Sequence, residues 1–265
     1  MSNENSSIIL EMQNVDKHFG GVHAIDNFSV KIEKGKVHGL IGPNGAGKTT
    51  IFNNITGIYA PDTGKIFLDG QDITGSPPSK VAQLGIGRTF QNIRLFANLP
   101  VLENVIIASG MDATYNMPQA FFHTKKFKER EKFLTEKAMG LLEIVGLQDK
   151  ANERASSLPY GHQRKLEIAR AMALNPKLLL LDEPAAGMNA EESLDLVNFV
   201  KEIKDKFNLT VLMIEHHMDV VTNLCDHCTV LNFGKTIAVG TPAEVKANPE
   251  VIRAYLGGDE SWPVF

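Results

Sequence analysis

Long apolar runs are missing from this sequence of 265 residues. A helix that crosses a bilayer needs roughly 20 mostly apolar residues, whereas the runs here are no longer than four or five, such as Leu178 to Leu181. The first residues, MSNENSSIILEMQ, also lack the positive start and the apolar centre of a signal peptide. We therefore expect the protein to stay in the cytoplasm and to owe any membrane role to a partner.

Cysteine is scarce, and an excess of positive charge is absent. The two cysteines, Cys225 and Cys228, form one CxxC pair, which can be read as a redox pair or as half of a zinc site. Because no second CxxC exists and an apolar strand follows, we favour buried structural thiols that stay reduced. The net charge of −4 excludes a general electrostatic affinity for nucleic acid, so no nucleic-acid partner is expected.

What remains is the composition of an ordinary globular chain, with 43% hydrophobic and 22% charged residues. Short runs typical of strands dominate the first quarter, and further apolar strands alternate with amphipathic segments, such as Glu191 to Phe207, after residue 177. The predicted strands are Ile8–Met12, Phe28–Ile32, Val37–Ile41, Lys65–Leu68, Leu178–Leu181, Thr210–Ile214 and Thr229–Asn232. Alternation of strand and helix predicts an α/β core with a parallel sheet.

The stretch from Val101 to Val145 has a helical, charged pattern instead. It predicts a helical insertion, with edges near Gln91 and Asn175, into the α/β core. We therefore expect one domain over residues 1–265, in which 1–91 and 176–265 form the core and 92–175 form a helical subdomain.

A phosphate-binding loop is the clearest motif. The buried strand Val37–Ile41 leads directly into GPNGAGKT and then into a helical segment. Glycines let backbone N–H groups converge on a phosphate chain, Lys48 can reach the β- and γ-phosphates, and the Thr49 hydroxyl can ligate Mg²⁺. A ligand-free glycine-rich turn would give these two residues no purpose. The predicted nucleotide-binding residues here are Gly42, Pro43, Asn44, Gly45, Ala46, Gly47, Lys48, Thr49 and Thr50.

Polar residues also follow two later strands. Leu178–Leu181 ends in Asp182 and Glu183, and in open α/β sheets ligands bind at the carboxyl ends of strands. We expect Asp182 to bind Mg²⁺ and Glu183 to act as the general base on the attacking water, although alone the pair could equally be solvated surface. Thr210–Ile214 ends in Glu-His-His, and either His216 or His217 can contact the γ-phosphate.

The segment LPYGHQ, which begins at Leu158, is followed by a helical stretch that leads into the acid-bearing strand. With the phosphate loop before it, this order resembles the ABC ATPase family, whose signature loop is LSGGQ. The resemblance covers essentially the whole chain. It implies the family's fold: a P-loop core with an N-terminal antiparallel β subdomain and an inserted helical subdomain.

The resemblance also implies roles for individual residues. Phe19 lies where the family stacks an aromatic ring on adenine, Gln91 looks like the glutamine that senses the γ-phosphate and Mg²⁺, and His216 matches the switch histidine. On chemistry alone Phe19 would be read as a core residue and Gln91 as a polar residue at a strand end. Further nucleotide contacts are implied at the positions of the signature and the D-loop, Leu158, Gly161, His162 and Asn189.

In that family two ATPase subunits pair head to tail, and each ATP lies between the phosphate loop of one and the signature of the other. The resemblance therefore implies ATP and Mg²⁺ as cofactors and a second ATPase subunit, identical or related, as partner. Three positions depart from the pattern: Pro159 replaces the signature serine, His162 the glutamine, and Asn189 the D-loop aspartate.

The sequences of these segments are similar to those of the ATPases of branched-chain amino acid importers, and so are the segments AAGMN, EHHM and GTPAEVKANPEVIRAYLG. This implies permease subunits as partners, a solute-binding protein as an indirect one, and a peripheral place on the inner face of the cell membrane. Importers of urea or amides and the lipopolysaccharide exporter are the alternatives. A non-transport ABC ATPase or a small-molecule kinase explains fewer of the motifs.

Overall fold

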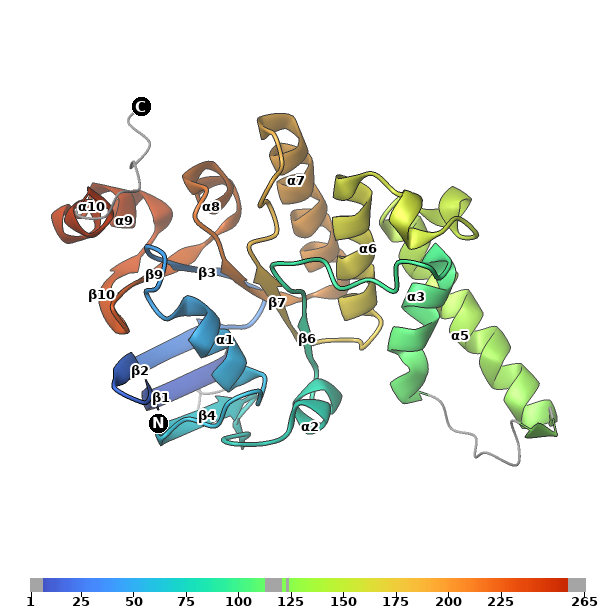
Figure 1. Ribbon diagram of the computed structural model, residues 1–265, viewed down its shortest axis with the longest axis horizontal. Coiled ribbons are helices and arrows are strands. Elements are labelled where there is room, and N and C mark those ends of the chain that lie inside the picture. Colours follow the sequence, from blue (N-terminus) through green and yellow to red (C-terminus); the bar gives the residue numbers. More distant parts are fainter. Residues whose placement is uncertain (1–6, 113–120, 123, 257–265) are drawn as a thin grey trace. The chain divides into compact units, whose positions relative to one another are not determined.

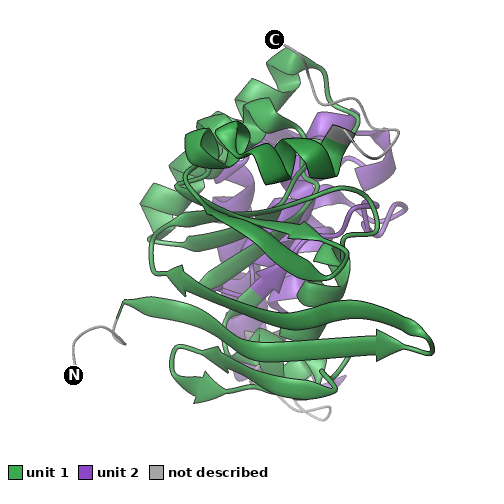
Figure 2. Ribbon diagram, turned by 90° about the vertical axis from the view of Figure 1, so that its left-hand side faces the viewer, with its two compact units in different colours: residues 1–86, 177–265 green, residues 87–176 purple. Residues whose placement is uncertain are grey.

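The computed structural model describes residues 7–112, 121–122 and 124–256 (Figure 1). Residues 1–86 and 177–265 form one compact unit, here called unit 1, and residues 87–176 form a second, unit 2 (Figure 2). No helix in the described part of the chain combines the length and the apolar character that a bilayer crossing demands.

A six-stranded sheet has the order β10-β9-β3-β8-β7-β6 and forms the centre of unit 1, whose first residue range ends inside β6. Four of its strands run parallel, and β10 pairs antiparallel with β9. Every residue of β3, β7 and β8 is buried, which explains why these strands are almost entirely apolar, with His38, Asp182 and Thr210 as their polar residues. The bounds are β3 Val37–Ile41, β6 Ile86–Arg88, β7 Leu178–Asp182, β8 Thr210–Ile214, β9 His227–Asn232 and β10 Lys235–Gly240.

A second, antiparallel sheet has the order β2-β1-β4-β5. Its strands are β1 Ile8–Phe19, β2 Val22–Glu33, β4 Thr63–Leu68 and β5 Gln71–Asp72. The predicted strands at Ile8–Met12 and Phe28–Ile32 are therefore too short. Beyond Met12 the register shifts repeatedly and most residues of β1 are exposed, so the apolar alternation stops although the pairing continues.

Helices cover both faces of the six-stranded sheet. Helix α1, Lys48–Ile55, packs Ile51, Phe52 and Ile55 into a core that it shares with both sheets, while α7 and α8 pack on each other at the opposite face (Figure 1). The remaining helices of unit 1 are α2 Pro78–Gln83, α7 Ala190–Phe207, α8 Met218–Leu224, α9 Pro242–Ala247 and α10 Pro249–Leu256. The mixed α/β class predicted from the strand and helix pattern is confirmed.

Unit 2 is helical in its described part. Helices α3, Val101–Ala108, α5, Lys125–Ile144, and α6, Tyr160–Met172, pack on one another, and short 3-10 turns lie at Ser109–Asp112, Gln148–Lys150 and Ala155–Ser157. The helical pattern predicted for 101–145 is thus divided between α3 and α5. The part of that prediction at 113–120 and 123 lies outside the described residues.

Both cysteines are buried and form no disulfide. A Cβ atom on Gly39 would stand 3.0 Å from Cys225 Sγ and 3.1 Å from Cys228 Sγ, so the two thiols pack against β3 where only glycine leaves room. A hydrogen bond with Cys228, and then burial, raise the pKa of Cys225 well above its usual value. This agrees with the expectation of structural thiols, because the reactive form of cysteine is the thiolate.

Candidate functional site

The loop between β3 and α1 has a backbone that excludes side chains at two positions. Gly42 (φ 147°) and Gly47 (φ 103°) both have positive φ. A Cβ atom on Gly42 would lie 2.1 Å from the carbonyl oxygen of Leu231, and one on Gly47 would lie 2.4 Å from that of Ala24. At Gly45, by contrast, nothing lies within 4 Å of an added Cβ. The loop is therefore packed against its neighbours on one side and open above Gly45, as a cradle for an anion requires.

Lys48 directs its ammonium group back onto this loop. The side chain is buried, and Nζ donates hydrogen bonds to the carbonyl oxygens of Gly42 at 2.5 Å and Pro43 at 2.9 Å. Helix α1 begins at this residue, and its N-cap, Gly47, provides no side-chain cap. A buried positive charge and the N-terminal end of a helix dipole thus meet at the loop, which favours a bound phosphate chain.

The acid pair, Asp182 and Glu183, lies at the end of β7, which is separated from β3 by β8 in the sheet. Asp182 is the last residue of β7 and is buried, and it lies level with Ile214 at the end of β8. Glu183 adopts φ 45°, in the left-handed region that residues other than glycine rarely enter, and its N–H donates to the Ile214 carbonyl oxygen at 2.9 Å. Such a conformation costs of order 1–3 kcal/mol and is concentrated at functional sites.

The two histidines after β8 differ in what they face. His216 Nδ1 lies 3.8 Å from Glu183 Oε2, whereas His217 Nδ1 lies 2.9 Å from Glu215 Oε1. Glu215 is fully buried, and its hydrogen bond is the main cause that raises the pKa of His217. Geometry therefore separates two candidates that strand-end chemistry alone left equivalent: His216 faces the proposed general base, and His217 faces a buried carboxylate.

Sheet topology explains why these residues converge. Strand β8 lies between β3 and β7, all three run parallel, and Leu40 and Asp182 are both level with Ile214. The phosphate loop, the His216 loop and the acid pair are consequently the three segments that leave neighbouring strands at one edge of the sheet. Ligands of open α/β sheets bind at this edge.

Phe19 lies at the end of β1 and is 42% exposed. Its ring makes an edge-to-face contact with Tyr59, at 5.1 Å between centroids, and Lys17 Nζ lies 5.5 Å from its centroid. Phe19 is thus not a core residue, and an exposed aromatic pair is consistent with stacking on a base. The sequence analysis missed Tyr59, since no motif marks it and only the fold brings it to Phe19.

Asn189 caps helix α7. Its side-chain oxygen accepts from Glu192 N at 2.9 Å, and the Glu192 carboxylate accepts from Asn189 N at 3.0 Å, which completes a capping box. The residue expected to contact nucleotide in a paired subunit therefore has its side chain engaged in holding the start of a helix.

The other predicted residues belong to unit 2. Gln91 is exposed, Leu158 is buried, and Gly161 and His162 lie in the first turn of α6, whose N-cap is Pro159. The pKa of His162 is lowered, mainly by burial. Pro159 contributes no side-chain cap, so the peptide groups of this turn are what α6 offers to an anion.

A fully buried arginine ties the Gln91 segment to α6, and the sequence analysis did not single it out. Arg164 donates to the carbonyl oxygens of Phe90 and Gln91, at 2.7 and 3.0 Å, and to Glu167 Oε2 at 2.8 Å. Glu167 in turn accepts from the N–H groups of Phe90 and Arg94. Burial raises the pKa of Glu167 even though the Arg164 charge opposes that rise.

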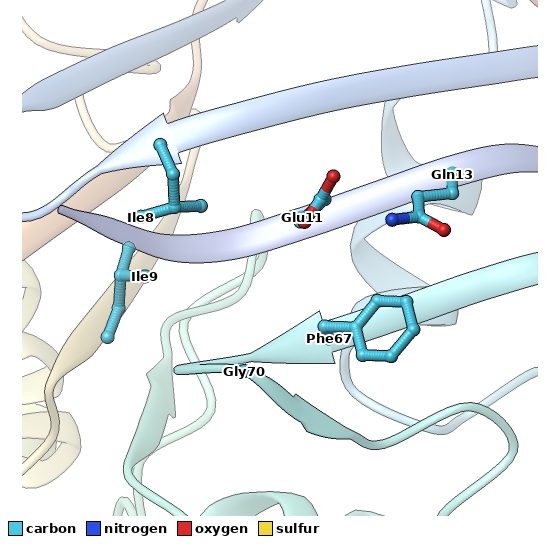
Figure 3. A pocket seen from close by; sticks show the side chains of 6 residues that line it. All are labelled: Ile8, Ile9, Glu11, Gln13, Phe67 and Gly70. Carbon is cyan, nitrogen blue, oxygen red and sulfur yellow. The ribbon is translucent and has the colours of Figure 1, made fainter. Parts of the chain in front are cut away.

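A separate hollow of about 210 Å³ lies on the antiparallel sheet (Figure 3). It contains none of the predicted site residues, and the carboxylate of Glu11 within it pairs with Lys31 at 3.2 Å. This hollow therefore takes no part in the site at the strand ends. Its lining residues are Ile8, Ile9, Glu11, Gln13, Phe67 and Gly70.

Known proteins with this arrangement are numerous. Residues 25–186 match the family model described as ABC transporter, and residues 235–261 match one described as branched-chain amino acid ATP-binding cassette transporter. The chain is 45% identical to the high-affinity branched-chain amino acid transport ATP-binding protein BraF of Pseudomonas aeruginosa, over 94% of this chain and 98% of that protein. It is 41% identical to the corresponding protein LivG of Escherichia coli, over 95% and 99%.

Solved structures agree with the fold. A crystal structure of the ADP conformation of an ATP-binding cassette of an ABC transporter superposes with a TM-score of 0.83 at 35% identity, over 95% of this chain and 99% of that one. A nucleotide-free ATP-binding cassette gives 0.82 at 34% identity, over 95% and 100%. The predicted fold, an ABC ATPase cassette, is thereby confirmed.

Proposed function

Since this chain belongs to the ABC transporter family, we propose that it is the ATP-hydrolysing subunit of an importer for branched-chain amino acids. The observation that carries the proposal is the edge of the sheet at which the segments that hold Lys48, Glu183 and His216 leave three neighbouring parallel strands. Support for the cargo comes from the relatives named for branched-chain amino acid transport and from the match of residues 235–261.

The residues present fit ATP and Mg²⁺. Phosphates would lie against the loop from Gly42 to Thr49, where added side chains collide at two glycines and the ammonium group of Lys48 supplies positive charge. The proposed magnesium ligands, Thr49, Gln91 and Asp182, all offer oxygen atoms, which Mg²⁺ prefers. When bound, the ion would neutralise charge on the phosphates.

The chain's own residues then divide the work. Lys48 holds the phosphates, and Glu183 orients a water molecule and draws a proton from it. His216 lies 3.8 Å from that carboxylate and would hold Glu183 in position while it contacts the γ-phosphate. Phe19 stacks on adenine from the end of β1.

We propose a head-to-tail pair of such chains as the working unit, with Leu158, Gly161, His162 and Asn189 of each facing the nucleotide of the other. Residues 92–175 would act as the helical subdomain, with Gln91 reporting the nucleotide state to permease subunits. In this proposal the chain lies on the inner face of the cell membrane, and a solute-binding protein delivers the cargo to the permeases.

Glu183→Gln is the direct test. The substitution keeps the shape of the side chain but removes the base, so hydrolysis should fall by about 10²- to 10⁴-fold while binding of a fluorescent ATP analogue stays within twofold of wild type. A variant that hydrolyses ATP as fast as wild type would refute the catalytic role.

The cargo needs a cellular test. In a strain lacking this gene, uptake of radiolabelled leucine should be lost, restored by the wild-type gene, and not restored by Glu183→Gln. Normal leucine uptake together with loss of urea uptake would instead assign the chain to a urea importer.

A further inference from the structure

Two groups of three side chains in the described part of the chain bring ligand atoms of metal-binding type within 4.8 Å of one another. One, here called the β8 cluster, consists of Glu215, His216 and His217. The other, called the hairpin cluster, consists of Asp16, His23 and Asp26. Of these six residues, only His216 has a role in the ATP hydrolysis proposed above.

Two side chains of the β8 cluster are exposed and the third is buried. The side chains of His216 and His217 are 44% and 43% exposed, and Glu215 beneath them is fully buried. Ions in solvent therefore reach both imidazoles, while the carboxylate supplies a negative charge in a place of low polarisability, where attraction to a cation is stronger than in water.

The distances between the imidazole nitrogens and the carboxylate oxygens of the β8 cluster are close to those between the ligands of a bound metal ion. His217 Nδ1 lies 2.9 Å from Glu215 Oε1, and His216 Nδ1 lies 3.9 Å from Glu215 Oε2. Both Nδ1 atoms thus face the Glu215 carboxylate, and the ring centroids are 4.1 Å apart. Four ligands at the usual zinc distances stand roughly 3.3 Å apart in a tetrahedron, and the two observed distances bracket that value.

A fourth ligand can come from solvent, because a zinc ion held by three protein groups keeps water in the fourth position. Glu183 Oε2, 3.8 Å from His216 Nδ1, lies beside the cluster but is not among the three ligand atoms that converge. Imidazole suits zinc and its neighbours in the first transition series, whereas Mg²⁺ and Ca²⁺ prefer six or more oxygen atoms. The donor set thus selects against the cation that ATP hydrolysis uses.

We propose that Glu215, His216 and His217, with water as fourth ligand, form a binding site for a divalent transition cation of the zinc class. Binding holds His216 in the coordination shell and away from Glu183 and the γ-phosphate. The cation is therefore an inhibitor of hydrolysis, a consequence that rests on the function proposed above. The binding of the cation does not depend on that function.

The hairpin cluster provides the matched control, because only one of its three ligands is an imidazole. Asp16 accepts hydrogen bonds from Asn27 N and Thr63 Oγ1, and Asp26 pairs with Lys235 Nζ at 3.0 Å. A cation there would have to displace these contacts. His23→Asn removes its one imidazole and leaves the β8 cluster untouched.

The test uses the full chain without nucleotide, with Zn²⁺ in calorimetry and Co²⁺ as the spectroscopic probe. Wild type and His23→Asn should each bind one ion at the β8 cluster with the same affinity, and Co²⁺ should give the visible absorption of a four-coordinate site. His217→Asn removes one ligand and should weaken binding at least about tenfold. Asparagine is a good N-cap, so helix α8, which His217 caps, should form normally.

Equal binding by wild type and His217→Asn, loss of binding in His23→Asn alone, or no binding by wild type at micromolar Zn²⁺ would overturn the proposal. A second readout is inhibition by buffered Zn²⁺ with Mg²⁺ and ATP in excess, which should weaken at least about tenfold in His217→Asn. A chain that binds Zn²⁺ as described but hydrolyses no ATP would refute the proposed function and leave the metal site standing.

Discussion

Single residues shape the proposed nucleotide site through backbone conformation as much as through charge. Gly42, Gly47 and Glu183 all have positive φ, and the two glycines lie against carbonyl oxygens from distant parts of unit 1. The glycines are required by contact, and Glu183 is held in place although its side chain disfavours that conformation. Substitutions at these positions should therefore act on stability and on function together.

Gly47→Ala and Gly45→Ala test this directly. Both positions have positive φ, so alanine costs about 1–2 kcal/mol at either, but only at Gly47 does the new Cβ meet an oxygen, at 2.4 Å. Urea unfolding should thus show a larger loss of stability for Gly47→Ala, accompanied by loss of ATP binding. An equal or larger loss for Gly45→Ala would contradict the contact argument.

His38 gives a residue-scale prediction for pH. Burial, and then the charge of His227, lower the pKa of His38 from 6.5 to about 4, and Nε2 lies 2.8 Å from Thr229 Oγ1. As the pH falls below about 6.5 the unfolded chain takes up this proton first, so the folded state loses up to about 3 kcal/mol of stability by pH 4. Above pH 6.5 that stability is fully present.

Chemical unfolding of wild type and His38→Gln at pH 7 and pH 4.5 measures this. The acid-induced loss of stability should be about 2–3 kcal/mol smaller in His38→Gln, whose amide can still bond to Thr229. The same loss in both proteins would show that His38 does not titrate as described.

Helices and strands were predictable to the degree that their residues are buried. Strands β3 and β8 have the bounds predicted, because all their residues are apolar or enclosed. The β1–β2 hairpin was underestimated, since its outer halves are bulged and partly exposed. The phosphate loop was readable because its glycines and lysine are required by contact, whereas the φ of Glu183 and the His216–Glu183 approach depend on how β7 and β8 pair.

The capping box of α7 supplies a prediction at the scale of an element. Because the Asn189 side chain accepts from Glu192 N, Asn189→Ala should destabilise the protein by about 1 kcal/mol. Asn189→Asp, which restores the residue usual in the family, keeps the cap and should unfold at the same urea concentration as wild type. If Asn189→Asp is as unstable as Asn189→Ala, the cap is not the reason for asparagine here.

For the molecule as a whole, nucleotide should stabilise through the residues of unit 1. Ligand at 100 times its dissociation constant contributes about 2.7 kcal/mol, which raises the melting temperature of a chain of this size by about 5–10 °C. Thermal unfolding of Glu183→Gln with ATP and Mg²⁺ should show this rise, since that variant does not consume the ligand. The same variant with Lys48→Ala added should show none, and a rise there would remove the phosphate-binding role from Lys48.

The left-handed conformation of Glu183 sets the stability of the fold against the catalytic role proposed for this residue. Glycine at this position would relieve a strain of order 1–3 kcal/mol, so Glu183→Gly should be more stable than wild type and, without the proposed general base, inactive. The fold could therefore be made more stable at this one residue only by giving up the turnover proposed for it.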